Sequence, residues 1–328
     1  MPIIGGGNDL APPGRDGYDS PLPRRARSSA PAGRDGTPMR ISFASLTDLG
    51  LVRQNNEDSF LLLDLEAGKR IGPPPPSGSG EMAMARGGLL LAVADGMGGA
   101  LAGEVASRMA MEVLVEARAK LAAATEEEAL RTILFDAIQE ANGRIHAASQ
   151  EEVRHRGMGT TLTAALLRGP RILFFQVGDS RGFIARKGKL HQMTKDHSLI
   201  GRLVDDKVIS AEDAEQLEGG RNIILQALGA EATVKVDYSD ATLGAGDSIL
   251  LCTDGLHGCV RRQEIEERVA TTPDSAQLCQ DLVNLARDRG GPDNITVVAV
   301  SLEQGEGGGE EPPGGPFKRL WRKIFPAT

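Results

Sequence analysis

Cysteine and long apolar runs are scarce in this chain, and each shortage excludes a class of protein. The three cysteines, Cys252, Cys259 and Cys279, form neither a CxxC pair nor an even set. This excludes a disulfide-stapled scaffold or a zinc finger and favours a reducing compartment. No run of about 18 apolar residues occurs, so we expect no membrane-spanning helix. The N-terminal stretch lacks the continuous apolar segment of a secretory signal, so we expect a cytoplasmic protein.

Positive charge and stacking groups are also in short supply. The 37 Lys and Arg residues are outnumbered by 45 Asp and Glu, which gives a net charge of −8, and aromatic residues make up 3% of the chain. Nucleic-acid-binding surfaces are typically basic, and single strands stack on aromatic side chains. We therefore expect no nucleic-acid partner. The five histidines show no metal-ligand spacing such as HxxxH, which argues against a zinc site.

Composition divides the chain into one folded body with flexible ends. Residues 1–39 are rich in Gly, Pro and Arg, and we expect them to be disordered because they bury too little apolar surface to offset the entropy of ordering. We expect one domain over residues 40–303, a flexible Gly/Pro linker over 304–316 and a helix over 317–325. Residues 66–88 include four consecutive prolines and are predicted to be an inserted surface loop.

Within the domain, strand-length apolar runs alternate irregularly with longer amphipathic segments. The strict strand–helix alternation of a Rossmann fold is missing. We predict an α+β layered domain, with a sheet packed on a second sheet or on helices. The predicted helices are 103–123, 126–149, 261–271 and 275–289, with a polar, helix-prone segment at 196–220. The predicted strands are 41–48, 59–64, 89–95, 160–167, 171–178, 182–188, 232–238, 248–253 and 295–300.

Carboxylates follow several of the apolar runs. Asp95, Asp179 and Asp254 each come after a stretch that should be buried, and Gly96 and Gly255 allow a sharp turn and the close approach of a ligand. If these strand ends converge, the carboxylates repel one another unless divalent cations neutralise them. Carboxylate, carbonyl and water oxygens are the ligands of Mg²⁺ or Mn²⁺. A single Asp-Gly is most often only a turn, so the joint occurrence of the patterns carries this hypothesis.

Two other phosphate chemistries fit the sequence poorly. Gly98-xxxx-Gly103 is followed by Glu104 where a P-loop needs Lys, and the GxGxxG pattern that starts at Gly96 fails at Leu101. No His lies at a spacing from a cysteine that suggests a nucleophile pair, so a cysteine phosphatase is not expected.

Five short patterns, taken together and in order, resemble those of the metal-dependent Ser/Thr protein phosphatases called PPM, or type 2C. They are RQNNED (53–58), VADGMGG (93–99), VGDSRG (177–182), LLCTDGL (250–256) and GGPDN (290–294). Two further stretches are similar to the bacterial branch, namely GMGTTLTAAL (157–166) and VGDSRGFIARKGKLHQMTKDHS (177–198). The resemblance covers about residues 41–302. It implies a four-layer α-β-β-α sandwich, in which two antiparallel sheets are flanked by helices and the active site lies at one end.

The resemblance also implies roles for individual residues. Two Mn²⁺ or Mg²⁺ ions are implied, with a third in bacterial members. Arg53 would bind the substrate phosphate, and Asp58 and Asp95 would share in catalysis. The implied metal ligands are the bridging Asp95, the Gly96 carbonyl with Glu57, Asp254 with Asp293, and Asp179 with Asp254 for the third ion. Asp58 would either bind through water or orient the bridging water. Asn294 is implied to support the ligands from behind.

The implied reaction is hydrolysis of phosphoserine and phosphothreonine in proteins by direct attack of a water that bridges the metals. Many eukaryotic members have a His where this chain has Met97, so the general acid is unassigned, and either a metal-bound water or a nearby residue can serve. The alternative is an inactive module that binds phosphoproteins or regulates a kinase, and the complete carboxylate set favours the enzyme. The implied partners are phosphorylated proteins, namely Ser/Thr kinases or their substrates.

Two further segments carry separate expectations. In residues 317–325, apolar side chains recur at helical spacing between Lys and Arg residues. This pattern predicts a basic amphipathic helix for the inner membrane face or a partner groove, with packing on the domain as the alternative. Residues 196–220 lie where the family has its flap, and they either contact the protein substrate or form an inert surface excursion.

Overall fold

The computed structural model describes residues 40–71, 77–83, 87–98, 102–151, 153–214 and 223–303. The predictions of a disordered segment over 1–39, a linker over 304–316 and a helix over 317–325 therefore concern residues that lie outside the described ranges.

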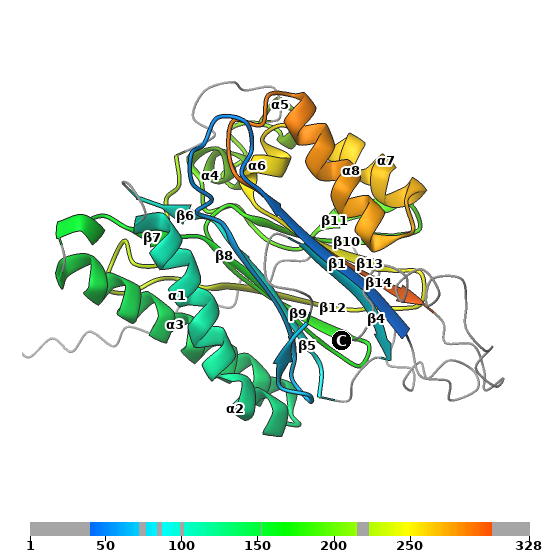
Figure 1. The fold of residues 1–328 in the computed structure, drawn as a ribbon, viewed down its shortest axis with the longest axis horizontal. Coiled ribbons are helices and arrows are strands. Elements are labelled where there is room, and N and C mark those ends of the chain that lie inside the picture. The colour runs from blue at the N-terminus through cyan, green and yellow to red at the C-terminus, as the bar shows by residue number, and fades with distance from the viewer. Residues whose placement is uncertain are drawn as a thin grey trace, which may run out of the picture. The chain divides into compact units, whose positions relative to one another are not determined.

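The described strands form two six-stranded antiparallel sheets and one two-stranded sheet (Figure 1). The first sheet contains, in spatial order, β11 (Lys189–Gln192), β10 (Arg181–Arg186), β13 (Ser248–Cys252), β14 (Ile295–Glu303), β1 (Arg40–Asp48) and β4 (Ser77–Ala83). The second contains β12 (Asp237–Thr242), β9 (Arg171–Val177), β8 (Leu162–Arg168), β5 (Leu89–Ala94), β2 (Ser59–Asp64) and β3 (Lys69–Arg70). In the small sheet, β6 (Gly96–Met97) pairs with β7 (Gly159–Thr160).

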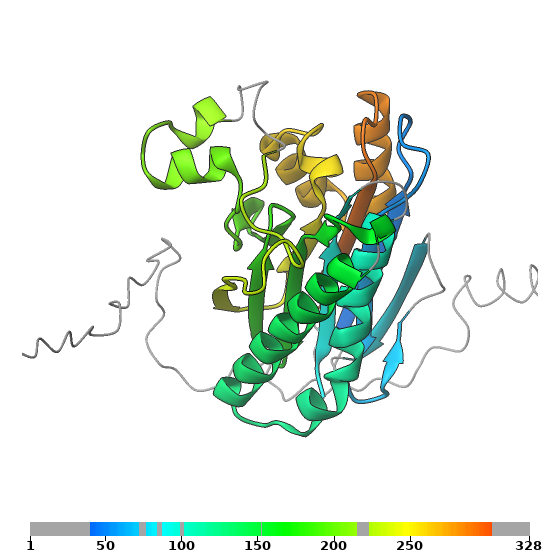
Figure 2. The same ribbon diagram turned by 90° about the vertical axis from the view of Figure 1, so that its left-hand side faces the viewer.

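Helices cover the outer faces of both large sheets (Figure 2). The second sheet is covered by α1 (Ala102–Glu116), α2 (Arg118–Ala123) and α3 (Glu127–Glu151), which a short 3₁₀ turn follows at Val153–His155. The first sheet is covered by α6 (Asp254–His257), α7 (Arg262–Thr271) and α8 (Ser275–Asp288). The short helices α4 (Leu199–Asp205) and α5 (Ala211–Ala214) lie between β11 and β12 in the chain. No helix in the described ranges is both long enough and apolar enough to cross a membrane.

The strand sequences explain the layers. Side chains alternate between the two faces of a strand. In β5, Leu90 and Ala92 join the apolar cluster under α1 and α3, whereas Leu91 and Val93 join the cluster between the two sheets. A strand with both faces covered needs a continuous apolar run, which is what residues 89–94 provide. The same alternation in β14 completes the third apolar cluster, under α6 to α8. The predicted α-β-β-α sandwich is therefore confirmed.

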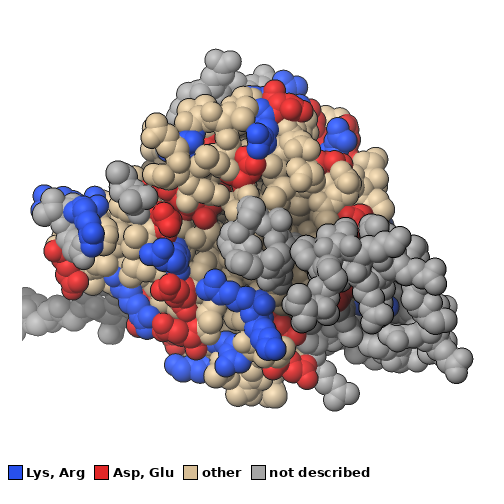
Figure 3. Space-filling view, viewed as in Figure 1, with Lys and Arg blue, Asp and Glu red and all other residues tan. Residues whose placement is uncertain are grey.

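The outer surface of the α1–α3 layer is highly charged, with both signs interspersed (Figure 3). Arg144 illustrates the arrangement, because it bonds to Glu116 on the neighbouring helix at 2.7 Å and to Glu140 one turn away at 2.8 Å. Exposed pairs of this kind contribute little to stability. They identify this surface as the solvent side of the layer.

Three sequence predictions need correction. Residues 66–88 are not simply a loop, because Ser77–Ala83 pairs along β1 as an edge strand. The strand predicted at 232–238 begins only at Asp237, because α3 side chains take up the preceding backbone: Asn142 donates to the Glu231 and Ala232 carbonyls at 3.1 and 3.2 Å. The single helix predicted over 103–123 is interrupted at Ala117, although the backbone there stays helical.

Candidate metal centre

The topology brings the predicted carboxylates to one end of the sandwich. Strands β5 and β9 both pair antiparallel with β8, so their C-terminal ends lie at the same edge. Asp95 follows β5 and Asp179 follows β9. In the other sheet, β13 pairs antiparallel with β14, so Asp254 at the end of β13 lies near Asp293 before β14. Residues far apart in the chain therefore meet at one edge.

Glu57 joins this group through the start of β2. Ser59 pairs with Ala94, which brings the chain before β2 alongside Asp95. The Gly96 N–H donates to the Glu57 carbonyl at 3.2 Å. A Cβ atom on Gly96 would lie 2.2 Å from the carbonyl oxygen of Gly103 in α1. Only glycine fits at position 96, so the backbone can pass between Glu57 and α1.

Asp58 is buried and held by two threonine hydroxyls. Its Oδ2 accepts from the Thr253 hydroxyl at 2.8 Å and from the Thr296 hydroxyl at 2.6 Å. Its Oδ1 is buried and has no hydrogen-bond partner among the described residues. Burial raises the pKa of Asp58 to about 7, against the two hydroxyl hydrogen bonds, and the nearby charges of Asp254 and Asp293 add to the rise.

Asp95 and Asp254 form the centre of the group. Each keeps part of its residue surface open to solvent, although its carboxyl group is densely surrounded by protein. Burial, followed by repulsion from Asp254 and Asp58, raises the pKa of Asp95 well above its ordinary value. Burial and repulsion from Asp293 also raise the pKa of Asp254. A hydrogen-bonding contact between the two carboxyl groups adds to the rise in the pKa of Asp95 and opposes the rise in the pKa of Asp254.

Asp179 is connected to Asp95 through buried hydroxyls. The Asp95 N–H donates to the Thr161 hydroxyl at 2.9 Å, and that hydroxyl lies 2.8 Å from the hydroxyl of Ser180. Burial, with repulsion from Asp254, raises the pKa of Asp179 to about 8. Its Oδ1 is buried without a partner among the described residues. The hydroxyl chain thus fixes the Asp95 and Asp179 segments against each other.

Arg53 and Asp293 bond to each other. The Arg53 Nη2 donates to the Asp293 Oδ2 at 2.6 Å, and the two side chains are 49% and 27% exposed. This hydrogen bond raises the pKa of Arg53 further above its ordinary value. The sequence patterns did not predict the pair. The family resemblance gives a role to one basic side chain at the site, Arg53, and this side chain is open to solvent.

Asn294 supports this part of the site with a single side-chain amide. Its Oδ1 accepts from the Glu57 N–H at 2.8 Å, and its Nδ2 donates to the Leu49 and Asn55 carbonyls at 3.0 Å each. The segment that carries Arg53 and Glu57 is therefore tied to the segment that carries Asp293.

The chemistry of these donors fits hard divalent cations. Within the described ranges, no three Asp, Glu, His or Cys side chains are placed to hold one ion together. Asp293 bonds to Arg53, and Asp58 bonds to two threonines. Even so, every donor is an oxygen, which suits Mg²⁺ or Mn²⁺. Buried carboxylate oxygens of Asp58, Asp179 and Asp254 lack a partner. A cation would satisfy these atoms and offset the repulsion.

Sequence patterns missed the two threonines around Asp58. Thr253 directly precedes Asp254, and Thr296 lies two residues after Asn294. Both are fully buried; Thr296 lies within β14, and Thr253 directly follows the apolar strand β13. A buried hydroxyl requires a hydrogen-bond partner, so a Thr inside an apolar run beside a carboxylate motif is the signal that could have identified them.

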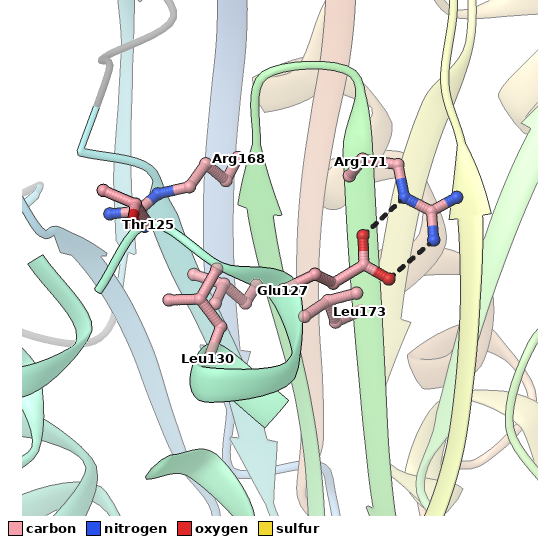
Figure 4. Close-up of a pocket in the computed structure, with 7 residues that line it drawn as sticks. Thr125, Glu127, Leu130, Arg168, Arg171 and Leu173 are labelled. Atoms are coloured by element: carbon pink, nitrogen blue, oxygen red, sulfur yellow. Dashed lines mark hydrogen bonds and ion pairs between the residues drawn. The ribbon is translucent and has the colours of Figure 1, made fainter. Parts of the chain in front are cut away.

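A cavity of about 170 Å³ lies at the opposite end of the sandwich, around the β8–β9 turn (Figure 4). Its two arginines are already engaged. Arg171 forms a two-point pair with Glu127 at 2.8 and 2.9 Å, and Arg168 donates to the Gly87 and Leu121 carbonyls. Leu130, Leu166 and Leu173 complete the lining. These contacts account for the arginines structurally, and the cavity is remote from the carboxylates.

Comparison with known proteins identifies the family of this fold. The family described as Protein phosphatase 2C matches residues 81–298. The serine/threonine phosphatase stp of Listeria monocytogenes is 36% identical over 257 residues, which are 78% of this chain and 94% of that protein. The crystal structure of the Mycobacterium tuberculosis serine/threonine phosphatase PstP superposes with a TM-score of 0.66 at 37% identity, over 80% of this chain and 99% of that chain.

A second PstP structure contains metal. The catalytic domain of PstP in complex with two manganese ions is 36% identical and has a TM-score of 0.64, over 81% of this chain and 99% of that chain. The family match covers well over half of the present sequence, and the agreement extends to both sheets. The chain therefore belongs to the protein phosphatase 2C family, the PPM-type metal-dependent Ser/Thr phosphatases, and is similar to its bacterial members.

Proposed function

We propose that this chain hydrolyses phosphoserine and phosphothreonine esters in proteins and that the carboxylates at the end of its sandwich hold two divalent cations. The observation that carries the proposal is the group of buried, mutually repelling carboxylates with unpartnered oxygens beside one exposed arginine. Such a group destabilises the fold unless cations bind. Its presence in a member of a hydrolase family supports a catalytic role.

The residues that would hold the ions follow from the motif positions. Asp95 would bridge the two ions, and a third ion would bind at Asp179 and Asp254. The remaining ligands would be Glu57 with the Gly96 carbonyl, Asp254 with Asp293, and Asp58 through water. When bound, two cations lower the pKa of a water that they share and offset the negative charge of the phosphate. Hard divalent cations would also explain why every proposed ligand is an oxygen donor.

Arg53 would orient the substrate. Its planar guanidinium can bond two oxygens of one phosphate. The Arg53 Nη2 donates to the Asp293 carboxylate at 2.6 Å, so an incoming phosphate would compete with Asp293 for this N–H donor. Because the arginine is half-exposed, it can reach a ligand that arrives from solvent.

Replacing Arg53 with Ala should raise KM for a phosphothreonine peptide about 10- to 100-fold and lower kcat less, because the lost contact mainly holds the ground-state phosphate. Arg53→Lys should recover only part of the affinity, since an ammonium cannot bond two oxygens in one plane. Steady-state kinetics at saturating Mn²⁺ measure both constants. Arg108→Ala, on the exposed face of α1, is the matched control, and an unchanged KM for Arg53→Ala would contradict the assignment.

Removing the Thr296 hydroxyl should lower activity about 10- to 100-fold, as is typical when a group behind a metal ligand is lost. Thr296→Val keeps the shape of the side chain but leaves Asp58 with one hydroxyl donor, whereas Thr296→Ser keeps the donor and should stay within about threefold of wild type. Rates measured across a Mn²⁺ titration test this. Thr194→Val, which removes a buried hydroxyl that accepts from the Gly182 N–H at 2.9 Å, controls for the loss of a hydroxyl alone. Equal rates for the Val and Ser variants would show that Asp58 does not need this contact.

The proposed activity is tested directly with the full chain. Peptides that carry phosphoserine, phosphothreonine or phosphotyrosine are incubated with Mn²⁺, Mg²⁺ or EDTA, and free phosphate is measured. We expect release from the first two peptides with either cation and none with EDTA. Release that persists in EDTA, or that is confined to phosphotyrosine, would contradict the proposal.

The proposed substrates are phosphorylated proteins, such as Ser/Thr kinases or the proteins they modify. Residues 196–220 are the candidate contact for such a protein. Helix α4 within this segment begins after Ser198, whose hydroxyl accepts from the Gly201 N–H at 3.1 Å. We also propose a third ion at Asp179 and Asp254, and a contact of residues 317–325 with a membrane surface or a partner protein.

A further inference from the structure

The loop between β1 and β2 exposes apolar side chains next to Arg53. Leu49, Leu51 and Val52 are 40%, 57% and 67% exposed. A single exposed apolar residue is ordinary on a protein surface. Three within four consecutive positions, ending directly before the arginine, form a local apolar surface. We refer to residues 49–52 as the apolar loop.

The apolar loop is held in place by specific contacts. The Leu51 N–H donates to the Gly291 carbonyl at 2.8 Å, and the Gly50 N–H donates to the Asp48 carboxylate at 2.8 Å. Gly50 has a φ of 75°, and a Cβ there would lie 2.2 Å from the Asp293 carbonyl oxygen. The loop is therefore fixed against the segment that carries Asp293. Its side chains are presented to solvent from an ordered backbone, which lowers the entropy cost of binding.

Two arginines near the apolar loop are already paired with carboxylates. Arg287 behind the loop donates to Asp48 at 2.7 Å, and Arg53 donates to Asp293 at 2.6 Å. An acidic residue beside the phosphate would lose hydration against these apolar side chains, whereas an apolar residue would remove water-exposed apolar surface on both partners.

We propose that Leu51 and Val52 contact the substrate residues that flank the phosphorylated side chain, and that this contact selects apolar residues there. The inference rests on the proposed role of Arg53 in holding the phosphate. Consecutive residues of a peptide lie about 3.8 Å apart, so the neighbours of a phosphothreonine held at Arg53 reach the side chains that immediately precede it. The occupant is an extended phosphopeptide segment of a substrate protein.

The test uses the full chain with Mn²⁺ and three phosphothreonine peptides that differ only in the two residues on each side of the phosphothreonine. These flanking residues are Leu and Val in the apolar peptide, Ser in the second peptide and Glu in the third. An aryl phosphate, which has no flanking residues, provides the reference rate. We expect kcat/KM to be at least about fivefold higher for the apolar peptide than for the Ser peptide, and lowest for the Glu peptide. In the double variant Leu51→Ser, Val52→Ser, the ratio of the apolar peptide to the aryl phosphate should fall about fivefold.

Phe135→Ser, which alters a 43% exposed apolar residue on α3, is the matched control and should keep the wild-type ratio. The inference is overturned if wild type does not distinguish the peptides, or if the preference persists in the double variant. In both of these cases hydrolysis itself would still support the proposed function. Failure to hydrolyse any of the esters with Mn²⁺ would overturn the proposed function and this inference together.

Discussion

Replacing Asp254 with Asn should abolish phosphatase activity and, in the same protein, raise the thermal stability of the metal-free form. Asp254 is the carboxylate whose charge raises the pKa of Asp58, Asp95 and Asp179 alike. The amide keeps the shape of the side chain but neither carries a charge nor binds a hard cation well. We expect turnover to fall by more than about 1,000-fold, whereas removal of the repulsion favours the folded state.

Two measurements on one preparation separate these effects. Initial rates with a phosphothreonine peptide at saturating Mn²⁺ report turnover, and thermal unfolding in EDTA reports stability. Asp136→Asn removes an exposed carboxylate of α3 and should change neither. An Asp254→Asn protein that keeps more than about a tenth of wild-type activity, or that unfolds at a lower temperature in EDTA, would show that this carboxylate does not have the central position assigned to it.

The metal-free protein should also lose stability as pH rises from about 5 to 8. The folded-state pKa values of Asp58 and Asp179, about 7 and about 8, lie above the ordinary value of 3.8. Between these limits the folded state binds more protons than the unfolded state, so unfolding releases protons and raising the pH favours unfolding. We expect the Tm in EDTA to be at least about 5 °C lower at pH 8 than at pH 5.

Saturating Mn²⁺ should remove or reverse this trend, because a bound cation replaces the protons that neutralise the carboxylates. Thermal unfolding at both pH values, with EDTA or Mn²⁺, makes the comparison. Asp58→Asn should flatten the dependence in EDTA, and Asp136→Asn should leave it as in wild type. If the EDTA-treated wild-type protein is equally stable or more stable at pH 8, the carboxylates are not buried together in solution.

The positions of the carboxylates could be predicted because they depend on strand ends. Asp95 and Asp254 follow apolar runs that are long enough for one buried strand and too short for a typical helix. Once β5 and β13 form in their antiparallel sheets, the residues after them must emerge at an edge. The family resemblance implied that both sheets pack face to face in one sandwich. The local pattern alone did not decide whether a sheet packs on a second sheet or on helices.

Other features depend on tertiary contacts that the local pattern does not contain. Residues 77–83 combine Ser and Gly with few apolar side chains, yet they form a strand because the free edge of β1 offers hydrogen bonds along their whole length. Val234 has the alternation of a strand, but Gln139 of α3 donates to its carbonyl at 2.8 Å. The bond between Arg53 and Asp293 depends on side-chain rotamers across 240 residues of sequence, which no local pattern specifies.

The single amide of Asn294 limits which substitutions the site can accept during evolution. Because it accepts from Glu57 and donates to the chain on either side of Arg53, the phosphate-holding segment and the Asp293 segment behave as one mechanical unit. An aspartate at this position would keep the acceptor but lose both donors. Substitutions in either segment must therefore remain compatible with the same three bonds, whereas Leu51 and Val52 project outside this constraint and are free to vary with the substrate.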